Sequence, residues 1–163
     1  MDTYVPGLFD RLMGDAGGAH GAGGAGGVVA QLSLEQLKDA VARDLEELLN
    51  TRMALPAGAL DAYPECAASI VNYGLIDFAG MCLSSSDDRA RICAALKAAI
   101  ERHEPRLRHV RARLEREAGA INRVSFVISA TLAVYPACEA VNFDAVLQPS
   151  SLRYSINRKG AAV

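Results

Sequence analysis

The stretch Glu104-Pro105-Arg106-Leu107 marks the point at which the spacing of apolar residues changes from that of a helix to that of a strand. Proline lacks a backbone N–H and disfavours the helical region for the residue before it, so a helix running up to His103 is expected to end here. Upstream, apolar residues recur every four positions, and downstream they alternate. The upstream set is Ile92, Leu96 and Ile100, and the downstream set is Val110, Ala112 and Leu114.

Helices are predicted before this corner. Residues 32–52 carry a single apolar stripe at steps of three and four, which is typical of an amphipathic helix. Ser33 and Gln36 are spaced to form a capping box at its start. Residues 84–103 begin with a serine run followed by two aspartates, and both residue types favour a helix N-terminus.

Between these two helices, residues 63–80 are expected to form a short helix followed by a turn. Ile70 and Val71 are predicted to face inward, and Gly74 is predicted to end the helix because glycine readily adopts the conformation found after a last turn. His103, at the end of the next helix, continues the apolar stripe. We interpret it as a hydrogen-bonded interface histidine, because no second ligand stands four residues away.

After the corner, alternation predicts strands. Residues 110–114 and 124–134 read as an antiparallel hairpin around Gly119, and two further strands are expected over 141–147 and 152–156. The sequence therefore predicts an α+β fold in which N-terminal helices pack on a C-terminal three- to four-stranded antiparallel sheet. The face of that sheet turned away from the helices is expected to carry Arg111, Arg113, Arg123 and Asp144.

The charge is unevenly distributed along the 163 residues. Residues 1–102 contain 8 Lys and Arg against 14 Asp and Glu, whereas residues 103–163 contain 9 against 5. The net charge of −2 and the absence of tryptophan argue against a nucleic-acid binder, which would show a larger basic excess and more aromatics for stacking. An acidic helical part and a basic strand part suit a module placed between differently charged protein neighbours, although two solvated faces explain them equally simply.

The cysteines do not form a recognisable motif. Cys66, Cys82, Cys93 and Cys138 lack CxxC spacing and have no histidine at ligand spacing, so we predict reduced, mostly buried thiols and no metal site. No signal-peptide pattern follows Met1, and no apolar run reaches the ~18–20 residues that span a bilayer. A cytoplasmic location without membrane insertion is therefore expected.

The N-terminal part differs in composition from the rest. Residues 1–13 form an apolar arm in which Leu8, Phe9 and Leu12 share one side of a short helix, and residues 14–31 are a Gly/Ala-rich flexible linker. The folded domain is expected over residues 32–157, with a tail over 158–163. Such an arm folds onto a partner or remains a frayed terminus.

Catalytic motifs are not recognisable in the sequence. There is no nucleophile elbow, P-loop or H-E-x-x-H pair, and no cofactor is implied. A glycoside hydrolase needs two carboxylates that face each other across a cleft. Glu104 is the one acid for which the sequence supports a role of this kind. Its conceivable partners are Asp77, Asp87 and Glu101. Cleavage of peptidoglycan is kept as the alternative function.

The chain resembles the TssE family, the lysozyme-like baseplate subunits of the bacterial type VI secretion system, and the related phage-tail baseplate wedge protein. Ile76 departs from the family pattern, where proline is common, and the Gly/Ala insertion is long. The matching segments, in the family's order, are Leu8-Phe9-Asp10-Arg11-Leu12, residues 41–52, residues 69–78, Glu104-Pro105-Arg106-Leu107 and the strands that end in Val141-Asn142-Phe143-Asp144.

The resemblance implies a structural protein that joins the wedge subunits TssF and TssG, lies beneath the first ring of the contractile sheath and starts sheath assembly beside components such as TssK. Glu104, Pro105 and Arg106 match the family's Glu-Pro-Arg motif, which is associated with holding the wedge partners. The alternative interpretation is that the proline only ends the helix and that the charges beside it are solvated. Our hypothesis is that Glu104 and Arg106 are held for these partners and not for each other.

Two further hypotheses concern the periphery of the domain. A free edge of the sheet along Val141–Leu147 would accept an extended strand of a sheath subunit. The arm with Leu8, Phe9 and Leu12 would anchor the protein in the baseplate.

Overall fold

The structure, a computed structural model, describes residues 4, 32–56, 58–78, 80–82, 84–115, 124–134, 138–148, 151 and 153–159. The predicted linker and most of the predicted arm, with Leu8, Phe9 and Leu12, lie outside these residues and stay predictions. The chain divides into two compact units, Met1–Val41 and Ala42–Val163. The helix α2, Leu34–Asn50, contributes residues to both.

In the first unit, two distant residues form an isolated antiparallel bridge. The N–H of Tyr4 donates to the carbonyl of Leu32, and the N–H of Leu32 donates to the carbonyl of Tyr4, both at 2.8 Å. The capping box at the start of α2 is confirmed, because Ser33 Oγ accepts from the N–H of Gln36 while Gln36 Oε1 accepts from the N–H of Ser33. These reciprocal bonds satisfy two N–H groups that a helix start leaves unpaired.

In the second unit, the C-terminal turns of α2 protect the edge of the last strand, β4 (Arg153–Arg158). Asn50 Nδ2 donates to the carbonyl of Tyr154 at 2.9 Å, and the N–H of Tyr154 donates to Asn50 Oδ1 at 2.8 Å. One turn earlier, Glu46 Oε2 accepts from the N–H of Ile156 at 2.8 Å. These side chains occupy hydrogen-bonding groups that a further strand would need, so they protect this edge from strand pairing.

The segment between α2 and the long helix contains two short helices, α3 (Pro64–Ala67) and the 3-10 helix η1 (Ile70–Asn72). The helix α4 covers Ser86–His103, and Ser85 Oγ accepts from the N–H of Asp88 at its start, as the serine run predicted. The prediction that Ile70 and Val71 face inward is wrong, because both side chains are exposed. A 3-10 turn of three residues presents them to solvent, and the buried residue of η1 is Asn72.

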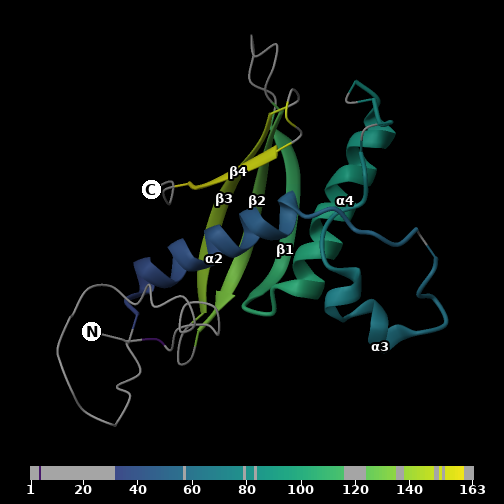
Figure 1. Cartoon of the computed structure of the whole chain (residues 1–163). Coiled ribbons are helices and arrows are strands. Elements are labelled where there is room, and N and C mark those ends of the chain that lie inside the picture. Colours follow the sequence, from purple (N-terminus) through teal and green to yellow (C-terminus); the bar gives the residue numbers. More distant parts are fainter. Residues whose placement is uncertain are drawn as a thin grey trace. The chain divides into compact units, whose positions relative to one another are not determined.

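The remaining strands are β1 (Leu107–Glu115), β2 (Val124–Ala133) and β3 (Cys138–Gln148). With β4 they form a four-stranded antiparallel sheet in the order β1-β2-β3-β4, and α4 runs beside β1 (Figure 1). The predicted α+β fold with N-terminal helices and a C-terminal antiparallel sheet is confirmed, and the sheet has four strands.

One face of the sheet contributes to the hydrophobic core. Alternate residues of β2 and β3 are buried together with residues of α2 and α4, and burying one such large side chain stabilises the fold by about 1.5–3 kcal/mol. On the other face Lys159 Nζ lies 3.2 Å from Glu115 Oε2 and 3.5 Å from Asp144 Oδ1. The largest buried side chains of the second unit include Phe126, Phe143, Leu45, Leu48, Leu49, Leu96, Ile100, Ile128 and Leu132.

Two details of the sheet differ from expectation. Strict alternation in β1 is interrupted by a bulge between Arg108 and Arg111, where His109 adopts a positive φ of 55°, so that Arg108 and His109 are both exposed. The hypothesis of a free edge along Val141–Leu147 is wrong, because these residues belong to β3, which pairs with β2 on one side and β4 on the other. Arg111 and Arg113 are exposed as predicted, and Arg123 lies outside the described residues.

The thiols are more accessible than the sequence suggested. Cys66, Cys82 and Cys138 are exposed and Cys93 is half-buried, and all four are free. The prediction of mostly buried cysteines is therefore wrong. Among the described helices, none is long and apolar enough to cross a membrane.

Candidate functional site

The Glu-Pro-Arg corner is a hydrogen-bonded turn placed directly at the end of α4. The N–H of Glu104 donates to the carbonyl of Ile100 at 2.8 Å, which closes the last helical turn, and the N–H of Leu107 donates to the carbonyl of Glu104 at 3.0 Å. A four-residue turn with this bond favours proline in its second position, where Pro105 stands. The turn therefore connects α4 to β1 through only three residues, Glu104, Pro105 and Arg106.

Inside the turn, the side chains of Glu104 and Arg106 bind each other. Arg106 Nε donates to Glu104 Oε1 at 2.7 Å, Arg106 Nη2 donates to Glu104 Oε2, and the backbone N–H of Arg106 donates to Glu104 Oε1 at 3.2 Å. Glu104 is buried, with 5% of its surface exposed. The paired bonds from one guanidinium to both carboxylate oxygens form the bidentate geometry in which such ion pairs are strongest.

Asp44 of α2 is the third member of this cluster. Arg106 Nη2 also donates to Asp44 Oδ2, across 62 positions of the chain, and Arg43 Nη2 lies 3.6 Å from Asp44 Oδ1. We call Asp44, Glu104 and Arg106 the corner triad. Asp44 was not identified as a site residue from the sequence. The available signal was its position beside Leu45, at the flank of the apolar stripe of this helix.

The electrostatics of the triad hold Arg106 in its charged form. Burial of the guanidinium opposes the charge, but the hydrogen bonds and charges of Glu104 and Asp44 outweigh this and raise the pKa of Arg106 above its ordinary value. An arginine that is anchored on two sides has little rotamer freedom left to lose when a partner binds.

The hypothesis that Glu104 and Arg106 are held for partner subunits and not for each other is therefore wrong in its second half. Their charges bind each other and Asp44, and this joins α2, the end of α4 and the start of β1. Pro105, between them, is exposed, and the Arg106 side chain keeps 27% of its surface exposed. The bonds to the two carboxylates use Nε and Nη2, so Nη1 is not among their donors.

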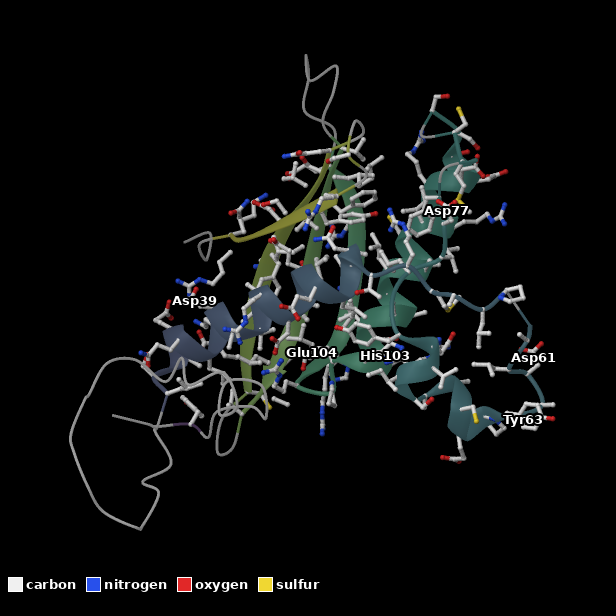
Figure 2. The ribbon with its side chains drawn as sticks, in the orientation of Figure 1. Asp39, Asp61, Tyr63, Asp77, His103 and Glu104 are labelled. Atoms are coloured by element: carbon white, nitrogen blue, oxygen red, sulfur yellow. The ribbon has the colours of Figure 1, made fainter. Side chains whose placement is uncertain are left out.

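A polar and aromatic contact lies next to the triad. His103 Nε2 donates to the carbonyl of Asn72 at 2.9 Å, and its ring meets Tyr73 edge-on with centroids 5.2 Å apart. Burial, followed by the charges of Glu47, Asp44 and Glu104, raises the pKa of Tyr73. Figure 2 shows His103 and Glu104 together at the C-terminal end of α4. His103 is thus a hydrogen-bonded interface histidine, as predicted.

The stability of the protein is expected to fall as the pH drops from 7 to 5, in part because of His103. Burial, together with the nearby charge of Arg102, lowers the pKa of His103 despite the bond to Asn72. The unfolded chain therefore binds more protons than the folded one below the ordinary histidine value of about 6.5, and the lost stability grows towards acid. Urea unfolding across this range should show a weaker pH dependence for His103→Gln. Arg102→Gln should weaken it partly, and an undiminished dependence in His103→Gln would contradict this assignment.

The geometry opposes a hydrolytic role for Glu104. Both of its carboxylate oxygens accept bonds from Arg106, and a general acid must carry its own proton. Asp87 lies at the opposite end of α4, about 25 Å away at 1.5 Å per residue, and Glu101 is exposed beside Lys97. Figure 2 places Asp77 on the loop before α4, away from Glu104. Within the described residues, no group of three His, Cys, Asp or Glu side chains is placed to hold a metal ion.

Comparison with known proteins gives two findings. The sequence model of the family described as baseplate wedge protein gp25 matches residues 35–137. A solved chain from a structure titled "The baseplate complex from the type VI secretion system" is similar over 70% of this chain and 96% of that chain, with 17% identity and a TM-score of 0.47. No curated protein sequence matches significantly. The matched residues 35–137 include the whole corner triad.

Proposed function

The chain belongs to the baseplate wedge protein gp25 family and is a structural baseplate protein, and from this premise we propose that it joins the wedge subunits of a type VI secretion baseplate through its Glu-Pro-Arg corner. The proposed partners are TssF and TssG. Once seated on the wedge, the protein supports the first ring of the contractile sheath, next to components such as TssK and at the cytoplasmic face of the inner membrane.

The observation that carries this proposal is the construction of the corner. A buried carboxylate and a second carboxylate from another helix hold one partly exposed guanidinium beside an exposed proline, on a backbone turn closed by a hydrogen bond. An ordinary surface ion pair does not need three elements of the fold to hold it. A contact that is already ordered avoids most of the entropy cost of binding.

The triad also suits a contact that becomes dry when the partner binds. Removing a lone arginine from water is costly, but Arg106 keeps its two carboxylate partners when it is covered. The wedge subunit needs to supply one acceptor for Nη1 and an apolar surface for the Pro105 ring. The arm with Leu8, Phe9 and Leu12 is proposed as a second, tethered anchor in the same baseplate.

The experiment uses Arg106→Lys, which retains the positive charge and can stay paired with Glu104 but lacks the planar fork that reaches two sides at once. Purified full-length chain and purified TssF–TssG complex are mixed, and the dissociation constant is measured at a temperature where both chains are folded. We expect at least a tenfold weaker complex for Arg106→Lys, corresponding to about 1.4 kcal/mol. Sheath formation in cells should fall in parallel.

The matched control is Arg113→Lys, an equally conservative change at an exposed position on β1. It should bind the wedge complex like the unaltered chain. Wild-type binding by Arg106→Lys would contradict the corner as the contact, and failure of the unaltered chain to bind would contradict the proposed function as a whole.

A further inference from the structure

Three large apolar side chains on one short segment are exposed to solvent. Tyr63 is 62% exposed, Ile70 84% and Val71 55%. They lie just before α3 and on η1, and we call them the apolar patch. Among the described residues these are the large apolar side chains with the highest exposure, and exposed apolar side chains that gather on one segment indicate a binding site more often than a scattered exposed leucine does.

The fold holds the apolar patch in place by hydrogen bonds beneath it. Ser69 Oγ accepts from the N–H of Val71 at 3.3 Å and donates to the carbonyl of Cys66 at 2.8 Å. Asn72 is buried, and its Nδ2 donates to the carbonyl of Ala67 at 2.9 Å while its own carbonyl accepts from His103. The polar residue of η1 thus points inward and the two apolar ones point outward. These bonds hold the backbone of η1 so that Ile70 and Val71 face outward before any partner binds.

Along the sequence, the segment that carries the apolar patch has charges of one sign. Residues 53–88 contain five acids and no lysine, arginine or histidine. Asp61 and Glu65, which flank Tyr63 at two positions on either side, are both exposed. Figure 2 shows Asp61 and Tyr63 next to each other on the segment that leads into α3. Exposed apolar side chains next to exposed acids are complementary to an apolar surface flanked by basic groups.

We propose that the apolar patch docks a basic, amphipathic segment of a neighbouring baseplate protein, as a second contact separate from the corner triad. This inference rests on the proposed function. Ile70 and Val71 would provide the buried centre of the contact, and Asp61 and Glu65 would face Lys or Arg side chains at its rim. The chain's own arm fits poorly, because residues 1–13 carry two aspartates and one arginine and so offer no basic excess.

The test compares two double variants in binding to the purified TssF–TssG complex. Ile70→Ser with Val71→Ser should weaken binding at least tenfold, because it removes the apolar centre. Asp61→Asn with Glu65→Gln should weaken binding severalfold at low salt and flatten its salt dependence, because exposed charges are screened as ionic strength rises. Both variants alter exposed side chains and should keep the wild-type melting temperature. The matched control is Glu101→Gln, an exposed acid on α4 that should bind normally.

Other outcomes would overturn the proposal. If both double variants bind the wedge complex normally while Arg106→Lys does not, the apolar patch is not a contact. The proposed function would be unaffected by that result. If the unaltered chain sediments as a dimer and the variant Ile70→Ser with Val71→Ser sediments as a monomer, the apolar patch binds a second copy of this chain. If deleting residues 1–31 increases the reactivity of the exposed Cys66 thiol in the isolated chain, the occupant is the chain's own arm.

Discussion

Replacing Arg106 with alanine is expected to lower the free energy of unfolding by about 3–5 kcal/mol, the usual cost of removing one partner from a buried ion pair. The guanidinium is bonded to both oxygens of Glu104 and to Asp44. Without it, Glu104 remains buried with one bond, from the backbone N–H of residue 106. Such a loss is a large part of the 5–15 kcal/mol that stabilises a typical domain. Urea unfolding followed by circular dichroism measures it directly.

Two controls separate the buried pair from a general charge effect. Arg43→Ala removes an exposed arginine 3.6 Å from Asp44 Oδ1 and should cost less than about 1 kcal/mol. Glu104→Gln combined with Arg106→Ala should be more stable than Arg106→Ala alone, because it no longer leaves a buried charge without a partner. An Arg106→Ala variant as stable as the unaltered chain would contradict the structural role of the triad. A loss of stability in Arg106→Ala would show that alanine at this corner affects the fold itself and not only the binding of partners.

Replacing Gly74 with alanine should cost about 2–6 kcal/mol, from backbone strain of about 1–3 and overpacking of about 1–3 kcal/mol. Gly74 has a φ of +113°, and a Cβ placed there would lie 2.5 Å from the carbonyl oxygen of Thr51. That carbonyl accepts from the N–H of Leu75 at 2.8 Å, and the N–H of Met53 donates back to Leu75. The clash would separate the chain after α2 from the segment that follows η1.

Alanine substitutions at two other glycines separate the backbone strain from the steric clash. Gly58 also has a positive φ, +84°, but its nearest neighbour would be Asp61 Oδ2 at 3.4 Å, so alanine there should show the backbone strain alone, about 1–2 kcal/mol. Gly80 has open space around it, and alanine there should change stability by less than about 0.5 kcal/mol. Unfolding curves of the three variants should rank Gly74 far above Gly58 and Gly80. Equal losses at Gly74 and Gly58 would exclude the clash with Thr51.

Several features of the fold were predictable because their causes are close together in the chain. Ser33 with Gln36, and Ser85 with Asp88, form caps between residues three positions apart. The switch from helix to strand at Pro105 follows from the missing N–H and the fixed φ of proline. The alternation in β2 and β3 predicted two strands with one buried face, and the structure confirms both.

Other features depended on which distant residues meet. Periodicity predicts that a strand exists, but β3 became central because β4 adds to its outer side, and the edge of β4 is closed by Glu46 and Asn50 from 110 and 104 positions away. Ile70 and Val71 resemble core residues in the sequence. The buried carboxamide of Asn72 decides instead which side of η1 faces the protein.

The amino-acid sequence by itself determined where helices begin, where the chain turns and which strands follow, because hydrogen-bond capping, proline geometry and apolar periodicity act over a few residues. The tertiary structure decided how the charges are paired. Glu104 and Arg106 stand two positions apart, but packing α2 against this corner brings Asp44 to the same guanidinium and removes Glu104 from water. Coulomb interactions act through space and strengthen with burial, so the corner triad exists only once the chain has folded.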